Sequence, residues 1–265
     1  MPEGIYQKLR LARTIKASPI DKIRLALILL KHQLDKRNTE IDMIIEIDGV
    51  KYLLVDLESL FIVSPRYEQV ILQHLTPRKG EVFVDVGAHI GKYALRIAKI
   101  VGNEGKVIAI EPDPRNFRAL MCGINLNKLT NVIALNVAAW DKECKLTLYL
   151  GESNRKLSKG GLYGRGTSSV KRKVGQKCEV LAKQLDDLIK ELNINRIDWV
   201  KLDAEGAEYE ILKGFIKTMR SYKPKIIAEL TINKARTIEL MKKLGFNAIS
   251  LATNYFFFKP VEEFA

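Results

Sequence analysis

Residues 81–98, EVFVDVGAHIGKYALRIA, constrain the fold more than any other part of this chain. The stretch 82–86 is apolar except for Asp85, as in a buried β-strand, and the glycine turn Gly87-Ala-His-Ile-Gly91 follows it directly. A helical pattern begins after the turn. A strand, a tight glycine turn and a helix form the first unit of a doubly wound sheet that binds nucleotides. The segment therefore predicts an α/β fold in which the turn faces a ligand.

The spacing of the glycines indicates which kind of ligand to expect. The turn reads G-x-x-x-G, whereas a dinucleotide fingerprint reads G-x-G-x-x-G and a P-loop ends in G-K-[ST]. Glycines allow the backbone to approach a ligand closely, and the following helix offers its first N–H groups to an anion. This pattern favours a ligand with a single carboxylate over a pyrophosphate, and S-adenosylmethionine is the common ligand of that kind. A strand–turn–helix that binds nothing is the alternative.

Glu111 is the second element of the expected binding site, about twenty residues beyond the glycine turn. It follows the short apolar stretch 106–110, and Pro112 and Pro114 stop the strand there. A carboxylate at such a strand tip can hold both hydroxyls of a ribose through two hydrogen bonds. Glu111 is therefore expected to bind the ribose of the donor; a plain solvated loop residue is the alternative.

The chain of 265 residues is long enough for one large α/β domain with an N-terminal extension. The extension is expected to cover residues 1–75, and the S-adenosylmethionine-binding domain residues 76–265. Within the extension, Asp48-Gly49 between two alternating stretches is a strong signal for a two-residue hairpin turn. Helices are expected on either side of this hairpin, at 20–33 and 66–75.

Strand and helix patterns alternate through the rest of the chain, which predicts a parallel sheet with helices on both faces. The last two strands are separated by only Ala252 and Thr253, so they must be antiparallel. We therefore expect a doubly wound, mostly parallel seven-stranded sheet of the Rossmann-like class I methyltransferase type, because NAD-binding Rossmann domains lack that hairpin. The expected strands are 82–86, 107–111, 132–137, 198–203, 225–230, 246–251 and 254–259, and the expected helices are 91–101, 114–127, 181–192, 206–219 and 234–244.

Candidate catalytic residues lie at the ends of two expected core strands. Asp203 ends strand 198–203, which lies beside strand 82–86 in a doubly wound sheet, and ligands bind outside such strand ends. Glu205 follows closely, and Glu229 lies at the tip of the next strand. An acid at the end of an apolar strand is costly unless it is paired, which favours a functional role for Asp203.

The pairing of these acids suggests two kinds of chemistry. Carboxylates that share a cleft can share a proton, so that one acts as a general base, or they can hold a hard cation such as Mg²⁺. Asp203 and Glu229 are therefore expected as catalytic residues and as ligands of an optional Mg²⁺. His89, inside the glycine turn, is a further candidate base. The structural alternative is that Glu205 and Glu208 cap the following helix and that His89 fills its turn.

The charge of the chain favours anionic partners. It contains 44 Lys and Arg against 31 Asp and Glu, a formal net charge of +13. Such a charge balance is typical of proteins that bind nucleic acid, anionic membrane surfaces or acidic small molecules. It does not distinguish among these three classes of partner. The segment 155–177 carries eight Lys or Arg, five Gly and no acid, and is expected to be a mobile loop. It is either a substrate loop for an anionic acceptor or a solvated insertion.

The cysteines and the apolar runs indicate the compartment. Cys122, Cys144 and Cys178 are scattered and odd in number, which favours a reducing compartment without a disulfide scaffold or a zinc site. The apolar run 25–30 is far too short for a membrane span, and no signal-peptide cleavage pattern accompanies it. The chain is expected in the cytoplasm, and peripheral membrane contact through the basic N-terminal helix is an open alternative.

Three longer motifs together resemble the FkbM-type methyltransferases: VDVGAHIGKYAL, EPDPRNFRAL with Asn125, and IDWVKLDAEGAEYEIL with Gly214. The resemblance covers roughly residues 65–260. It implies a class I fold, S-adenosylmethionine as the methyl donor, and usually O-methylation of a hydroxyl on a sugar or natural product. It carries no information on residues 1–60 or on the basic loop, so it does not identify the acceptor. The residues expected at the donor site are Asp85, Gly87, Ala88, His89, Gly91, Glu111, Pro112 and Ala138.

The leading functional hypothesis is therefore an S-adenosylmethionine-dependent methyltransferase that acts on a hydroxyl of a sugar, lipid-linked or other small-molecule acceptor. An RNA methyltransferase that uses the basic loop 155–177 is the alternative. The sequence contains no N-P-P-Y-type motif, no cysteine motif for base methylation and no recognisable RNA-binding module. Nucleic acid is accordingly the less favoured partner.

Overall fold

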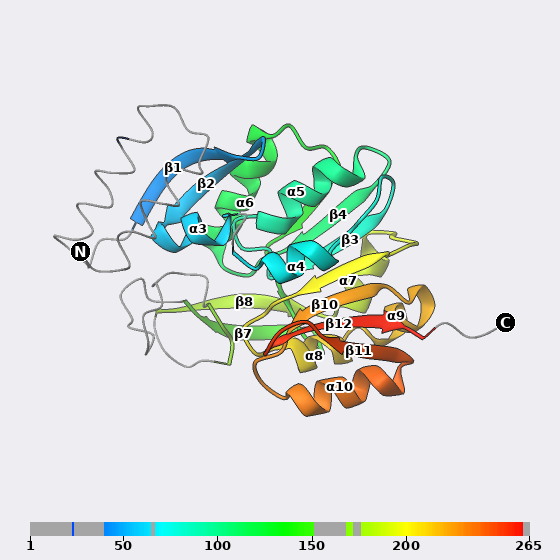
Figure 1. Cartoon of the computed structure of the whole chain (residues 1–265). Helices are drawn as coiled ribbons and strands as arrows, with labels where there is room; N and C mark the ends of the chain where they lie inside the picture. The colour runs from blue at the N-terminus through cyan, green and yellow to red at the C-terminus, as the bar shows by residue number, and fades with distance from the viewer. Residues whose placement is uncertain (1–22, 24–39, 65–66, 151–167, 172–175, 262–265) are drawn as a thin grey trace.

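The computed structural model of the chain describes residues 23, 40–64, 67–150, 168–171 and 176–261 (Figure 1). The expected helix at 20–33, apart from residue 23, and most of the basic loop 155–177 lie outside the described residues. None of the helices within the described ranges is long and apolar enough to cross a membrane.

A seven-stranded sheet forms the centre of the fold, in the order β11-β12-β10-β9-β3-β4-β5. The strands from β10 to β5 run parallel, and β12 is antiparallel to both β10 and β11. This confirms the doubly wound, mostly parallel sheet with a C-terminal antiparallel pair that the sequence predicted. The strands are β3 (Val82–Val86), β4 (Lys106–Ile110), β5 (Val132–Leu135), β9 (Trp199–Leu202), β10 (Lys225–Glu229), β11 (Phe246–Ser250) and β12 (Tyr255–Pro260).

Helices cover both faces of the sheet because successive strand residues point to opposite sides. Phe83 belongs to the core cluster that includes residues of α5 and α6, whereas Val84 belongs to the cluster that includes residues of α7 to α10. Figure 1 shows α5 and α6 above the sheet and α8 and α10 below it. The helices are α4 (Gln69–His74), α5 (Lys92–Val101), α6 (Pro114–Leu126), α7 (Leu185–Glu191), α8 (Glu208–Lys213), α9 (Ile216–Tyr222) and α10 (Lys234–Lys243).

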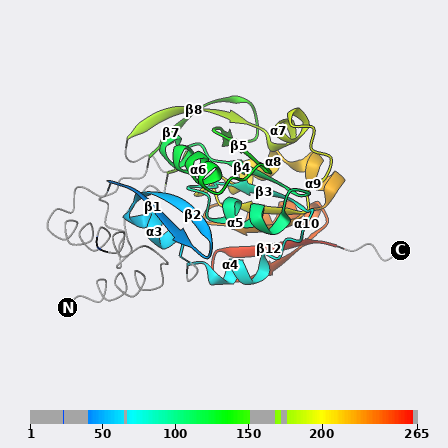
Figure 2. The same ribbon diagram turned by 90° about the horizontal axis from the view of Figure 1, so that it is seen from above.

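The predicted hairpin is present as β1 (Glu40–Ile47) and β2 (Val50–Asp56), which pair antiparallel. Asp48 and Gly49 both have positive φ angles, 52° and 75°, as a two-residue turn of this kind requires. The short helix α3 (Leu57–Ile62) follows it. Figure 2 shows the hairpin lying against α6, and its buried side chains share one core with those of α5 and α6. The division of the chain at residues 75 and 76 stays a prediction.

Two expected helices were wrong in part. The expected helix 181–192 begins as a strand, β8 (Lys177–Lys183), because Val180 and Ala182 are buried while Leu181 between them is exposed. This alternation has the period of a strand and not of a helix. With β6 (Ala138–Ala139) and β7 (Cys144–Tyr149), β8 forms a small three-stranded sheet that the sequence did not predict.

The second wrong element is the expected helix 206–219, which is divided into α8 and α9 around Gly214. A Cβ atom on Gly214 would overlap the main-chain carbonyl oxygen of Trp140. The chain therefore needs a glycine where the loop after β6 passes close to it.

Candidate active site

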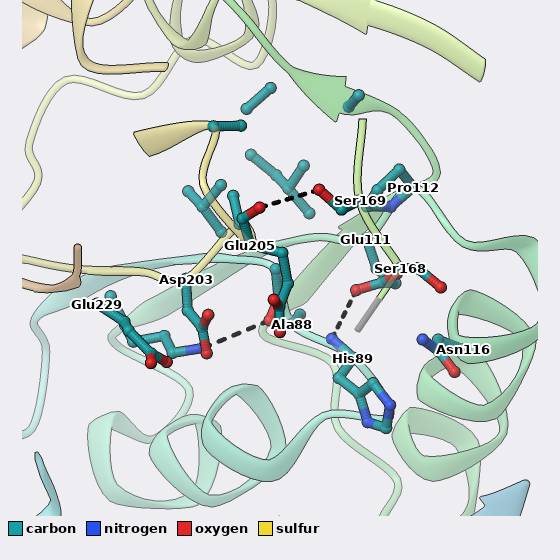
Figure 3. A pocket seen from close by; sticks show the side chains of 18 of the residues that line it. Ala88, His89, Glu111, Pro112, Asn116, Ser168, Ser169, Asp203, Glu205 and Glu229 are labelled. Atoms are coloured by element: carbon teal, nitrogen blue, oxygen red, sulfur yellow. Dashed lines mark hydrogen bonds and ion pairs between the residues drawn. The ribbon is translucent and has the colours of Figure 1, made fainter. Parts of the chain in front are cut away.

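A cavity of about 250 Å³ opens at the carboxyl ends of β4, β3, β9 and β10, where ligands bind in doubly wound sheets. The loops that follow these strands line most of it (Figure 3). Residues that precede the core also line it: Glu58, Ile62, Tyr67 and Glu68. The extension is therefore part of the wall of this site.

The two glycines of the turn serve internal packing. Gly87 has a φ of 77°, and a Cβ atom there would overlap the main-chain carbonyl oxygen of Asp203. Gly91, the N-cap of α5, has a φ of 96°, and a Cβ there would crowd Leu95 and Leu120. These glycines therefore let β9 and α6 approach the turn, and their expected role in making room for a ligand stays a prediction.

Glu111 lies directly after β4 and is 5 % exposed. Its Oε2 accepts a hydrogen bond from the His89 backbone N–H at 2.7 Å, and its Oε1 accepts one from the Asp113 backbone N–H at 2.9 Å. Burial raises the pKa of the Glu111 carboxyl to about 8, although both amide donors favour its ionised form. Each carboxylate oxygen keeps a second lone pair, so the predicted grip on two ribose hydroxyls is chemically available.

His89 occupies the middle of the turn in a left-handed conformation, with a φ of 52°. Both of its ring nitrogens are buried, and neither has a hydrogen-bond partner among the described residues. Burial lowers the pKa of the imidazole, which is therefore neutral near pH 7. In Figure 3 the ring lies on the side of Asn116, away from Glu229.

Three carboxylates from distant parts of the chain meet at the other end of the cavity, and we name them the acid cluster: Glu68, Asp203 and Glu229. One oxygen of each lies within 4.8 Å of the others. Asp203 comes directly after β9, and Glu229 is the last residue of the adjacent β10, so the sequence placed this pair correctly. Burial, followed by the charges of Asp203 and Glu68, raises the pKa of the Glu229 carboxyl to about 7.

Two buried lysines face the acid cluster. Lys201, in β9, places its Nζ 3.1 Å from Asp203 Oδ2, and its register partner in β3 is Asp85. Burial opposes its charge, but the carboxylates of Asp203, Asp85 and Glu68 outweigh that effect and raise the pKa of Lys201. Lys92 forms a 2.8 Å ion pair with Glu68, and burial lowers the pKa of Lys92 to about 8.

Glu68 is the principal site residue that the sequence did not reveal. It precedes α4 with a positive φ of 55°, and its side chain accepts hydrogen bonds from Lys92, Tyr93 and Tyr255. Burial alone would raise the pKa of Glu68, but Lys92 and Lys201 reverse that effect and lower it. No local pattern marks this residue, because its partners are brought together only by the fold. Lys201, by contrast, stands out in the sequence, because it is a charged residue inside the apolar strand W-V-K-L.

Asp85 lies beneath the cavity and does not line it. The residue has no exposed surface, and its Oδ2 accepts the backbone N–H of Ala94 in the first turn of α5 at 3.0 Å. Burial raises the pKa of its carboxyl to about 6, although Lys201 opposes the shift. Asp85 therefore holds the start of α5 in place behind the glycine turn.

The capping alternative holds for Glu208. Its Oε1 accepts the backbone N–H groups of Ala204 and Gly206, at 3.0 and 2.9 Å, and so fixes the loop between β9 and α8. Glu205, in the same loop, has a positive φ of 52° and lines the cavity. Its main-chain oxygen accepts a hydrogen bond from Ser169 Oγ at 2.9 Å.

The described part of the basic segment, residues 168–171, also contributes to the site. Ser168 Oγ donates to Asp113 Oδ2 at 2.9 Å, while the neighbouring Ser169 donates to the opposite wall at Glu205 (Figure 3). Both serines line the cavity. This short stretch therefore spans the loops that follow β4 and β9.

The structure thus brings most of the sequence-predicted residues to one cavity. Among the expected donor residues, those that line it are Gly87, Ala88, His89, Glu111, Pro112 and Ala138. Asp85 and Gly91 support the turn from behind. The candidate catalytic residues Asp203, Glu205, Glu229 and His89 all line it, and their individual roles stay predictions.

Comparison with known families gives one match over more than half of the chain: the methyltransferase FkbM domain family matches residues 85–248. Among curated proteins, methyltransferase sdnD of Sordaria araneosa is 28% identical over 198 residues, which cover 64% of this chain and 74% of that protein. A tRNA(Phe) (4-demethylwyosine(37)-C(7)) aminocarboxypropyltransferase of Pyrococcus horikoshii is 35% identical over 82 residues, 31% of this chain and 28% of that protein.

Among solved structures, the FkbM methyltransferase of Methylobacillus flagellatus KT is similar at 15% identity and a TM-score of 0.49. The alignment covers 96% of this chain and 58% of that chain. This chain therefore spans little more than half the length of that relative.

Proposed function

This chain belongs to the methyltransferase FkbM domain family and is an S-adenosylmethionine-dependent methyltransferase, and on that premise we propose that it methylates a hydroxyl group. The acceptor we propose is a sugar, a lipid-linked compound or another small molecule. The observation that carries this proposal is the acid cluster at the tips of β9 and β10, in the same cavity as the glycine turn and Glu111.

The donor is proposed to lie across the strand tips from β4 to β9. Glu111 would accept hydrogen bonds from the ribose hydroxyls, and the turn Gly87–Gly91 would face the methionine part. Neighbouring parallel strands lie about 4.8 Å apart, so Asp203 is about two strand spacings from Glu111. The sulfonium is joined to the ribose by a single carbon, and this spacing supports a position of the methyl group close to Asp203.

The chemistry needs a proton acceptor, because a neutral hydroxyl is a weak nucleophile. The acceptor oxygen forms a bond to the methyl carbon as the sulfur–carbon bond breaks, and the hydroxyl proton passes to a carboxylate of the acid cluster. The products are a methyl ether and neutral S-adenosylhomocysteine. Asp203, ion-paired with Lys201, would orient the acceptor or take the proton, and Glu229 would support it.

A metal-assisted version is the alternative for the same cluster. Oxygen ligands from three carboxylates suit Mg²⁺, which would lower the pKa of the acceptor hydroxyl. We favour the metal-free version because the ammonium groups of Lys201 and Lys92 already bond Asp203 and Glu68. Turnover measured with and without a chelator separates the two versions: a loss that added Mg²⁺ restores would assign the metal.

The acceptor class can be tested without knowing the acceptor. The purified chain is incubated with methyl-labelled S-adenosylmethionine and either the small-molecule fraction or the RNA fraction of an extract from the source cells. We expect the label in the small-molecule fraction, as an alkali-stable methyl ether, and not with the Asp203→Asn variant. Label confined to RNA would overturn the proposal.

An RNA methyltransferase remains the second candidate, favoured by the net charge of +13 and by the short match to a tRNA-modifying enzyme. A gel-shift titration with tRNA across salt tests it, because binding through phosphates weakens steeply as salt rises. Tight, salt-sensitive binding together with labelled RNA would favour this candidate.

A further inference from the structure

The extension contributes an accessible aromatic ring to the wall of the cavity. Tyr67 lines the cavity and is 43% exposed, whereas Tyr93, which also lines it, is buried. The partly buried Ile62 of α3 lines the same cavity. Pockets for small molecules are lined mainly by such aromatic and apolar side chains, with a few polar groups that fix the orientation of the ligand. The proposed methyl transfer uses the acid cluster and assigns no role to Tyr67.

The main chain of Tyr67 is held firmly while its side chain stays accessible. Its carbonyl oxygen accepts a 2.9 Å hydrogen bond from Lys92 Nζ, and the same ammonium lies 4.6 Å from the centre of the tyrosine ring. The next residue, Glu68, has a left-handed φ of 55° and accepts hydrogen bonds from Lys92 and from two tyrosines. A residue other than glycine keeps this conformation only where its surroundings fix it. Tyr67 is therefore presented to the cavity by a rigid segment.

Tyr67 lies at the acid-cluster end of the cavity. Burial of its phenol group, followed by the charges of Glu68, Asp203 and Glu229, raises the pKa of that group. Charges shift a pKa in this way only over short distances, so the phenol lies close to the carboxylates that are proposed to take the proton of the acceptor. An acceptor whose hydroxyl reaches Asp203 would therefore have Tyr67 beside it.

The chemistry of this end favours an uncharged ring as the acceptor. A ring has a face that can pack on an aromatic side chain, and it loses less conformational freedom on binding than an open chain. A phosphate or carboxylate on that ring would meet the negative charges of the acid cluster, whose neighbouring ammonium groups already bond Glu68 and Asp203. Hydroxyl groups, by contrast, can donate hydrogen bonds to these carboxylates.

We propose that Tyr67 is a specificity-determining residue for the acceptor: its ring packs against an uncharged, hydroxylated ring and directs one hydroxyl of that ring toward Asp203. This inference rests on the proposed hydroxyl methylation and adds the shape and charge of the acceptor. Tyr67 and Ile62 lie outside residues 85–248, which match the FkbM domain family, whereas Asp203 lies within them. Selection of the acceptor is thereby assigned to the extension, and the chemistry to the matched domain.

The first test compares Tyr67→Ala and Tyr67→Phe in the transfer of labelled methyl groups to the small-molecule fraction of an extract from the source cells. The rate is measured against the concentration of the fraction. Removing the ring should raise the half-saturating concentration by about three- to tenfold, the scale of a lost aromatic contact, and change the maximal rate less. Phenylalanine keeps the ring and should restore the wild-type value to within about twofold.

Tyr209→Ala is the matched control. Tyr209 is also a partly exposed tyrosine with a cation over its ring, Arg236 at 4.8 Å, but it is not among the described residues that line the cavity. This variant should leave the half-saturating concentration unchanged.

Donor binding and stability separate recognition from a structural role. The carbonyl group that bonds Lys92 belongs to the main chain and is kept in Tyr67→Ala. The dissociation constant for S-adenosylhomocysteine, measured by calorimetry, and the melting temperature should therefore stay close to the wild-type values. A lower melting temperature and weaker donor binding, with an unchanged half-saturating concentration of the fraction, would make Tyr67 structural and overturn the proposal.

The labelled product tests the class of acceptor. Mass spectrometry of the product formed by the wild type should place the methyl ether on an uncharged ring. A methyl ether on an open chain, or on a ring that carries a phosphate or a carboxylate, would overturn the proposed acceptor.

The outcomes distinguish this inference from the function on which it rests. A wild-type chain that transfers no label to a hydroxyl of a small molecule would contradict the proposed hydroxyl methylation itself. Labelling by the wild type, with equal half-saturating concentrations in Tyr67→Ala and Tyr209→Ala, would overturn only the role of Tyr67.

Discussion

The two ends of the cavity differ in how their polar groups are satisfied. At the end near Glu111, His89 and Asn116 keep buried atoms without partners in the described part of the chain. In the acid cluster, Glu68 accepts three side-chain hydrogen bonds, and Asp203 is ion-paired with Lys201. The polar groups of the second end are thus satisfied by the protein itself, and those of the first end are not.

This contrast indicates a division of labour. Buried polar groups without partners in the free protein add affinity when they bond a ligand, because they have already been removed from water on folding. Groups that are balanced by internal cations keep a fixed charge and position, which is what proton transfer and electrostatic stabilisation need. Substitutions at the acid cluster should therefore change turnover or stability, and substitutions at the end near Glu111 should change donor binding.

The largest effect is expected from Asp203→Asn. If Asp203 accepts the proton, kcat with the true acceptor should fall by about 10²–10⁴, while the dissociation constant for S-adenosylhomocysteine changes little. Steady-state kinetics and calorimetry measure the two quantities. Near-normal turnover in this variant would remove Asp203 from the chemistry and leave it as a residue of the fold.

The next effect concerns the internal balance of the acid cluster. Lys201→Met keeps the length of the side chain but leaves Asp203 and Asp85 without their buried cation, and it should lower the free energy of unfolding by about 3–5 kcal/mol. Urea denaturation measures this loss. Lys106→Met is the control, since Lys106 is the exposed first residue of β4. Equal stabilities of the two variants would show that the cluster does not depend on Lys201.

At the other end of the cavity, Glu111→Ala should weaken donor binding by about tenfold or more, because charge-assisted hydrogen bonds to the ribose are lost. Turnover at saturating donor should change much less than in Asp203→Asn. Calorimetry with S-adenosylhomocysteine checks the first value, and an unchanged dissociation constant would remove Glu111 from the donor site.

The smallest effect is a pH dependence of donor affinity. Burial raises the pKa of ligand-free Glu111 to about 8, and ribose hydroxyls donate to the ionised carboxylate. The protonated form must therefore lose its proton before it binds, so affinity should increase by about tenfold from pH 7 to pH 9. Glu111→Gln should show a flat profile over the same range; an equally steep profile in that variant would assign the dependence to another group.

Much of the donor half of the site could be predicted from the sequence. Apolar runs that end in Glu111, Asp203 and Glu229 put acids at neighbouring strand tips once the sheet order was assumed, and the structure places these three at that edge, whereas Asp85 lies beneath it. These predictions depended only on local patterns and on a general rule of topology.

The rest required tertiary information. Glu68 reaches the acid cluster from the extension, and nothing in its neighbourhood distinguishes it from a surface glutamate. In the sequence, Asn116 resembles any polar residue in the first turn of a helix, and only the structure shows that it lines the cavity. The sequence predicts a helix from residue 181, but residues 181–183 end the strand β8: their leucine and alanine have good helix propensity, and pairing with β7 overrides that preference.

The contact between Gly87 and Asp203 limits how this site can change. Because a side chain at Gly87 would overlap the main-chain oxygen of Asp203, the glycine turn and the end of β9 constrain each other's position. Helix α3, which contributes Glu58 and Ile62 to the wall of the cavity, lies outside this contact. Over evolutionary time a new acceptor could therefore be accommodated through this segment, while the donor and the catalytic acid keep their mutual position.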